Sequence, residues 1–131
     1  MGYRLLALFE VVRTLAEAGD SLPGHKLDKV IDEVSRVYSK VFMDDIALVE
    51  SFAVVKESLK GRPPTDEDET VVRMASSLLD KVEVEYGLVR EAEDVFYKSL
   101  EKNLGKEVAS LVKMFEIAMR QAEGSNNNKV Y

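Results

Sequence analysis

The sequence contains no cysteine, no tryptophan and only one histidine in 131 residues. Without cysteine the chain has no disulfide and no Cys-ligated zinc or iron–sulfur site. His25 follows a Pro-Gly pair, and no serine or second histidine is patterned near it. The sequence therefore indicates neither a hydrolytic triad nor the Glu-x-x-His ligand pattern of di-iron bundles. A glycine loop that could cradle a phosphate is also missing, so we expect no catalytic residue, no metal site and no cofactor.

Long apolar runs and basic runs are missing as well. Every apolar run is shorter than the roughly 20 residues that a membrane span needs. Glu10 and Arg13 interrupt the apolar start of the chain, which favours a helix of the mature protein over a signal peptide. The formal net charge of −6 and the lack of a Lys/Arg run work against nucleic-acid binding. We expect a cytoplasmic protein that binds neither a membrane nor nucleic acid, and the 32% of charged residues is typical of a thermophile.

Apolar residues recur at three- and four-residue steps through most of the chain, which is the period of a helix. The hydrophobic share of 46% is enough for one domain with a core at this length. We therefore predict a single all-α domain over residues 1–123, made of five or six antiparallel helices, and a loose polar C-terminal tail over residues 124–131. The expected helices span residues 3–18, 27–42, 46–60, 66–86, 88–102 and 106–123.

The firmest predicted boundary is the Gly-Arg-Pro-Pro segment at residues 61–64, because two prolines exclude a helix there. Thr65 is predicted to cap the helix that follows. The acidic run at residues 66–69 would stabilise its first turn by roughly 0.3–1 kcal/mol per carboxylate, through the helix dipole.

The boundary near residue 44 is less sharply defined. Asp44 can cap a new helix there, and we interpret the Asp44-Asp45 pair as a cap and not as a catalytic dyad. We favour a break because one helix over residues 27–60 would far exceed the mean length of about 11–12 residues. A single continuous helix is the alternative.

The helical period also predicts which side chains face the core. In the expected helix 66–86 the inward residues are Val71, Ala75, Leu78, Leu79 and Val82. In the expected helix 88–102 they are Val89, Ala92, Val95, Phe96, Ser99 and Leu100. Charged residues fill the opposite face of the second of these helices, which indicates that this face is exposed to solvent.

The segment at residues 85–103 has the strongest local pattern. Gly87 permits a tight turn between antiparallel helices, Ala92 allows them to approach closely, and Phe96 fills the space between hairpins. Together with Leu79, Ser99 and Leu100, these residues resemble part of a tetratricopeptide repeat over about residues 73–104. The residues that depart from the family pattern are Ser76, Asp80, Glu83 and Leu104. The resemblance implies a stack of helical hairpins, and an ordinary helical bundle with the same core is the alternative.

If the resemblance holds, the helix over 66–86 lines the concave side of the stack, where such repeat proteins hold peptides or partner helices. The binding residues predicted on this outer face are Met74, Ser77, Lys81, Val84 and Glu85. Met74 and Val84 are apolar and lie off the core stripe, which favours a contact surface independently of the resemblance. Packing of both against the next helix is the alternative. We predict a non-catalytic protein–protein interaction or scaffold module, or a small subunit of a larger complex.

Apolar residues beside the main stripes predict self-association, most simply as a homodimer. The first helix is broadly apolar, and Tyr38, Phe42 and Val54 lie beside the core stripes of their helices. A chain of this size has a limited interior in which to bury them all, and apolar patches that stay exposed mark contacts.

A second functional class is an acidic, metal-dependent hydrolase that acts on nucleotides. Asp66 and Glu69 with Glu91 and Asp94 resemble the acidic motifs of all-helical nucleotide pyrophosphohydrolases, whose carboxylates hold Mg²⁺. The alternative for the first pair is complementation of the helix dipole, since both lie in the first turn of their helix.

Overall fold

The computed structural model describes residues 2–41, 45–59 and 63–128. This part of the chain forms six α-helices and no strand, so the all-α prediction is confirmed. The helices are α1 (Gly2–Glu17), α2 (Gly24–Ser39), α3 (Ile46–Ser58), α4 (Asp66–Tyr86), α5 (Val89–Leu104) and α6 (Lys106–Asn128). None of these helices combines the length and the apolar composition that a membrane crossing requires.

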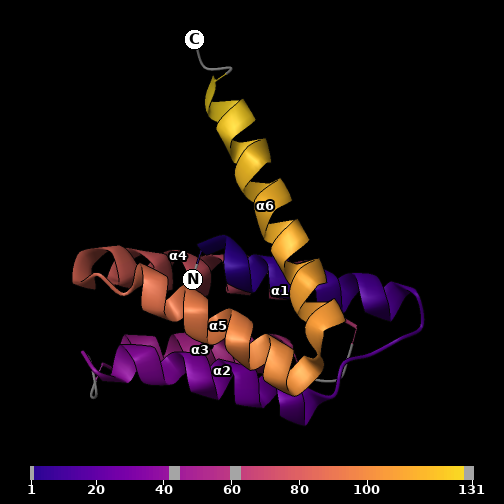
Figure 1. Cartoon of the computed structure of the whole chain (residues 1–131), viewed down its shortest axis with the longest axis horizontal. Helices are drawn as coiled ribbons and strands as arrows, with labels where there is room; N and C mark the ends of the chain where they lie inside the picture. Colours follow the sequence, from indigo (N-terminus) through magenta and orange to yellow (C-terminus); the bar gives the residue numbers. More distant parts are fainter. Residues whose placement is uncertain (1, 42–44, 60–62, 129–131) are drawn as a thin grey trace.

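The helices pack as a bundle in which each helix contacts two main neighbours. In spatial order the bundle runs α6, α1, α4, α3, α2 and α5, and α5 returns to α6 (Figure 1). The spatial order differs from the chain order because α1 packs on α4 and α6, far along the sequence. The C-terminal part of α6 extends beyond the other five helices (Figure 1).

The core lies inside this arrangement and is made of aliphatic and aromatic side chains from all six helices. Phe9 of α1 and Phe96 of α5 are fully buried within it. Burial of large aromatic side chains supplies much of the hydrophobic stabilisation of a domain of this size.

Local capping chemistry sets the helix starts that the sequence predicts. The carboxylate of Asp45 accepts hydrogen bonds from the amides of Ala47 and Leu48, over 2.9 and 3.3 Å, so α2 and α3 are separate helices. Asp44 lies outside the described residues, and its neighbour provides the cap. Thr65 caps α4 as predicted, and with Asp68 it forms a reciprocal capping box.

Glycine ends α4 at the predicted position. Gly87 has φ of +67°, in the left-handed region that favours glycine. The amide of Leu88 then donates to the carbonyl oxygen of Glu83 over 2.8 Å, which closes the last turn of the helix.

Two of the core positions predicted in the helices 66–86 and 88–102 are exposed. Val71 has an exposed fraction of 36%, while its neighbour Val72 is fully buried, so the prediction for Val71 is wrong. Val89 is also exposed, and the preceding Leu88 is buried in its place. In each case two apolar residues are adjacent in the sequence, and helical periodicity alone does not decide which of them faces the core.

Two helices have boundaries that differ clearly from the predicted ones. Helix α2 begins at Gly24, directly after Pro23, and ends at Ser39, short of residue 42. Helix α6 continues to Asn128, so the backbone of residues 124–128 is helical where a loose tail was expected. Residues 129–131 lie outside the described part of the chain.

Candidate functional site

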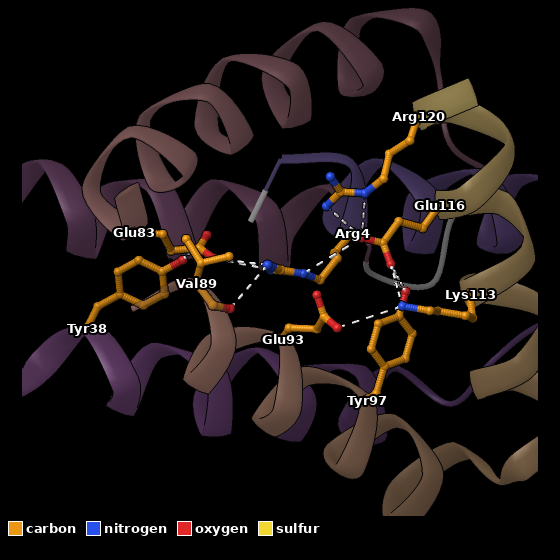
Figure 2. Close-up of polar contacts among 9 residues, drawn as sticks. All are labelled: Arg4, Tyr38, Glu83, Val89, Glu93, Tyr97, Lys113, Glu116 and Arg120. Carbon is orange, nitrogen blue, oxygen red and sulfur yellow. Dashed lines mark hydrogen bonds and ion pairs between the residues drawn. The ribbon is translucent and has the colours of Figure 1, made fainter. Parts of the chain in front are cut away.

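A buried polar network joins five helices at the centre of the bundle (Figure 2). Arg4 of α1 donates from both terminal nitrogens to Oε1 of Glu83 on α4, each over 3.1 Å. Tyr38 of α2 donates its hydroxyl hydrogen to Oε2 of the same carboxylate over 2.6 Å. All three side chains are inaccessible to solvent or nearly so. The carboxylate is thus satisfied on both oxygens, as a buried charge requires.

Glu116 of α6 forms the second half of the network. Its carboxylate accepts a hydrogen bond of 2.5 Å from the hydroxyl of Tyr97 and one of 2.9 Å from Nη2 of Arg120. Lys113 donates to it over 3.4 Å. Nε of Arg4 lies 3.9 Å from Oε2 of Glu116, so Arg4 is placed between the two carboxylates (Figure 2).

Burial and hydrogen bonding shift the acid–base properties of the network. Burial strongly raises the pKa of the Tyr38 phenol. Burial also raises the pKa of Tyr97, and its hydrogen bond to Glu116 adds to the effect. Burial alone would raise the pKa of Glu116, but the hydrogen bonds from Tyr97 and Arg120 and the nearby cations outweigh it, so the pKa is lowered. Glu116 is therefore ionised and both tyrosines are neutral donors at neutral pH.

The geometry of this network indicates a structural role. Every carboxylate oxygen of Glu83 and Glu116 has a donor within the chain, and both side chains are closed off from solvent. The network holds α6 against α1 and α5, because Glu116 is contacted by Arg4 and Tyr97.

This network was not predicted from the sequence, although the helical spacing of its two acids is a signal for it. Glu83 lies four residues after Leu79, and Glu116 lies four residues after Val112, so each acid continues a core stripe of its helix. Tyr38 was predicted to contribute to an exposed apolar patch. This expectation is wrong, because its ring is buried and its hydroxyl is bonded to Glu83.

The second candidate site is the outer surface of α3 and α4. Helix α3 has apolar side chains on its outer side as well as on the side that faces the core. Ile46 and Val49 have exposed fractions of 72% and 61%. No element of the described chain covers these two apolar side chains.

A groove with a volume of about 390 Å³ runs between α3 and α4. We call it the α3–α4 groove. Its lining residues are Ala47, Glu50, Ser51, Val54, Val71, Met74, Ala75 and Leu78. Most of these side chains are apolar, and Glu50 is the single charged residue among them. Val49 lies on the other side of α3, where it lines a hollow between α2 and α3.

The five predicted binding residues all lie on the exposed surface of α4. Met74 and Val84 have exposed fractions of 70% and 68%, so neither packs against the next helix. Met74 lines the groove, whereas Ser77, Lys81, Val84 and Glu85 do not.

The acids of the predicted nucleotide-hydrolase site are each paired with a cationic side chain, and Asp66 and Glu69 share Arg13. Asp66 and Glu69 lie 3.7 and 3.6 Å from the guanidinium nitrogens of Arg13. Glu91 pairs with Lys40, which directly follows α2, and Asp94 pairs with Lys98 on its own helix. Within the described residues, no three His, Cys, Asp or Glu side chains are grouped so that they could hold a metal ion.

Comparison of the chain with known protein families, curated proteins and solved structures gives no match. The resemblance of residues 73–104 to a tetratricopeptide repeat therefore stays a prediction. Any function has to be inferred from the geometry of the chain itself.

Proposed function

We propose that this protein is a protein–protein interaction module that binds its partner through the α3–α4 groove and the exposed apolar side chains around it. The observation that carries the proposal is the exposure of Val54, Val71 and Met74, which line the groove and have exposed fractions of 39%, 36% and 70%. Single exposed apolar residues are normal on protein surfaces, whereas a contiguous apolar patch beside a groove marks a contact site.

The chemistry of the groove fits a helical protein segment better than a small polar ligand. Its floor contains the small residues Ala47, Ser51 and Ala75, which allow a helix backbone to come close. Met74 stands at its edge and can adjust to different apolar partners, because its side chain is unbranched and flexible. Lys81 and Glu85, farther along α4, supply a polar rim.

No described feature specifically favours the nucleotide hydrolase, so we propose one function. A cytoplasmic location fits the composition and is part of the proposal.

The proposal is tested by capturing partners from a lysate of the source cells with the tagged protein. The variants are Met74→Glu and Val54→Glu, which introduce charge at the groove. The matched control is Met114→Glu, because Met114 is about as exposed as Met74 but lies on α6. The proposal predicts that bound proteins, including untagged copies of the chain itself, are lost with both groove variants and retained with the control. Equal capture by all four proteins would contradict it.

A further inference from the structure

We propose that the partner at the α3–α4 groove is a second copy of this chain, related to the first by a two-fold axis, so that α3 of each copy lies in the groove of the other. This inference rests on the proposed function and specifies its partner. A two-fold dimer requires a surface that is complementary to itself, and both a groove and a matching ridge occur on this surface.

The ridge is the outer edge of α3. Ile46, Glu50, Ala53 and Glu57 follow one another at helical steps along it, and all four are exposed. The groove beside the ridge has the small floor described above, and Val54 and Met74 stand on its two sides. A ridge of one helix that enters a groove between two others is the usual geometry of helix packing.

The direction of the helices fixes which residues of the two copies meet. Helices α3 and α4 are antiparallel, and a two-fold axis across α3 makes the partner's α3 antiparallel to α3 as well. The partner's α3 therefore runs parallel to α4. The groove is lined from Ala47 to Val54 on α3 and from Val71 to Leu78 on α4, so an axis at its middle passes beside Glu50.

Charge complementarity supports this register. Glu57 lies six to seven residues beyond the middle of the groove on α3, and Lys81 lies equally far beyond its middle on α4, about 10 Å in each case at 1.5 Å per residue. The partner's Glu57 therefore comes level with Lys81, and the symmetry repeats this pair. Both residues are exposed, and the salt bridges among the described residues include neither of them. Each is thus available for a pair between copies.

The same register has one unfavourable consequence. The two copies of Glu50 come close to each other beside the axis, and like charges at a contact weaken association. Replacement of Glu50 by glutamine keeps the shape of the side chain and removes the repulsion. If an unrelated partner filled the groove, Glu50→Gln would not be expected to strengthen self-association.

Sedimentation equilibrium of the full chain at tens of micromolar, at low salt, tests the proposal. We expect a dimer for the wild-type protein and a monomer for Met74→Glu. Glu57→Lys and Lys81→Glu should each weaken the dimer by about ten-fold, because each substitution places like charges together twice in one dimer. The double variant Glu57→Lys with Lys81→Glu should recover most of the loss, and Glu50→Gln should strengthen the dimer. Circular dichroism of each variant checks the fold.

Three outcomes would overturn the proposal. They are a wild-type monomer throughout the concentration range, a dimer that Met114→Glu disrupts and Met74→Glu does not, and a charge-swapped double variant that is no stronger than its single variants. A wild-type monomer that still captures other proteins through Met74 would overturn this inference and leave the proposed function standing. A wild-type protein that neither dimerises nor captures other proteins through Met74 would contradict both this inference and the proposed function.

Discussion

The hydroxyl group of Tyr38 donates a hydrogen bond of 2.6 Å to Oε2 of Glu83, although 45 positions separate the two residues in the sequence. Both side chains are buried. The bond fixes α2 against α4 across the bundle, and the remaining carboxylate oxygen is held by Arg4 of α1. Three helices are therefore tied together at one carboxylate.

The first prediction is that Tyr38→Phe destabilises the protein by about 1.5–3 kcal/mol, because a buried charged acceptor loses one donor while the ring still fills its place. Urea unfolding followed by circular dichroism measures the change. A free energy of unfolding equal to that of the wild-type protein would show that the bond contributes nothing.

The second prediction concerns Arg4, which lies between the carboxylates of Glu83 and Glu116. Arg4→Met should cost about 3–5 kcal/mol, because it leaves buried negative charge without its cation. Arg90 is exposed, and Arg90→Met is the matched control with an expected change within about 0.5 kcal/mol.

A compensated variant tests the same mechanism. The triple substitution Arg4→Met, Glu83→Leu and Tyr38→Phe removes the charged pair together with its donor. It should be more stable than Arg4→Met alone, since replacement of a whole buried ion pair by apolar residues is often neutral. A triple variant that is less stable than the single one would argue that shape, and not uncompensated charge, determines the loss.

The third prediction is a dependence of stability on pH through Glu116, whose pKa is lowered in the folded state. A lowered pKa contributes stability that is fully present above the unfolded value of about 4.3 and is lost as the pH falls through the folded value. Glu116→Gln should therefore be less stable than the wild-type protein at neutral pH, with a smaller loss on acidification below pH about 4.

Glu10 provides a control of opposite sign. Burial raises its pKa in the folded state, so its ionised form opposes folding at neutral pH. On acidification, Glu10→Gln should lose more stability than the wild-type protein, whereas Glu116→Gln should lose less. Thermal melts of the three proteins between pH 3 and 7 compare these slopes, and identical curves would contradict both assignments.

The fourth prediction concerns the turn between α4 and α5. Gly87→Ala should destabilise the protein by about 1–2 kcal/mol, because alanine is strained in the left-handed region. Gly24, within α2, is the matched control, since its backbone is not left-handed and a Cβ atom there meets no other atom within 4 Å. Gly24→Ala should be neutral or slightly stabilising. If the melting temperatures of Gly87→Ala and Gly24→Ala shift equally, the prediction is contradicted.

The features that the sequence predicted well depend on residues close to one another along the chain. The cap at Thr65 and the turn at Gly87 follow from local chemistry, and so they could be located without knowing the tertiary structure. The helical period likewise predicts that Ala92, Phe96 and Leu100 share the buried face of α5.

The features that could not be predicted depend on distant partners. Arg4 and Glu83 are 79 positions apart, and although Glu83 continues the core stripe of α4, nothing local identifies Arg4 as its partner. The choice between Val71 and Val72 depends on where α3 covers α4, which is also a property of the tertiary structure. For the α3–α4 groove, Met74 on the outer face of α4 was predicted, but the contribution of Ala47 and Ser51 on α3 was not.

The most direct test of the central claim, that two copies meet through their α3–α4 grooves, uses the absence of cysteine from the chain. A single cysteine at Glu50→Cys lies beside the proposed axis, and one at Met114→Cys lies on α6 as the control. After mild oxidation at tens of micromolar, non-reducing electrophoresis measures the covalent dimer. The account predicts a rapid, nearly complete disulfide-linked dimer for Glu50→Cys and little for Met114→Cys. A Glu50→Cys protein that stays monomeric, or that forms dimer no faster than Met114→Cys, would contradict it.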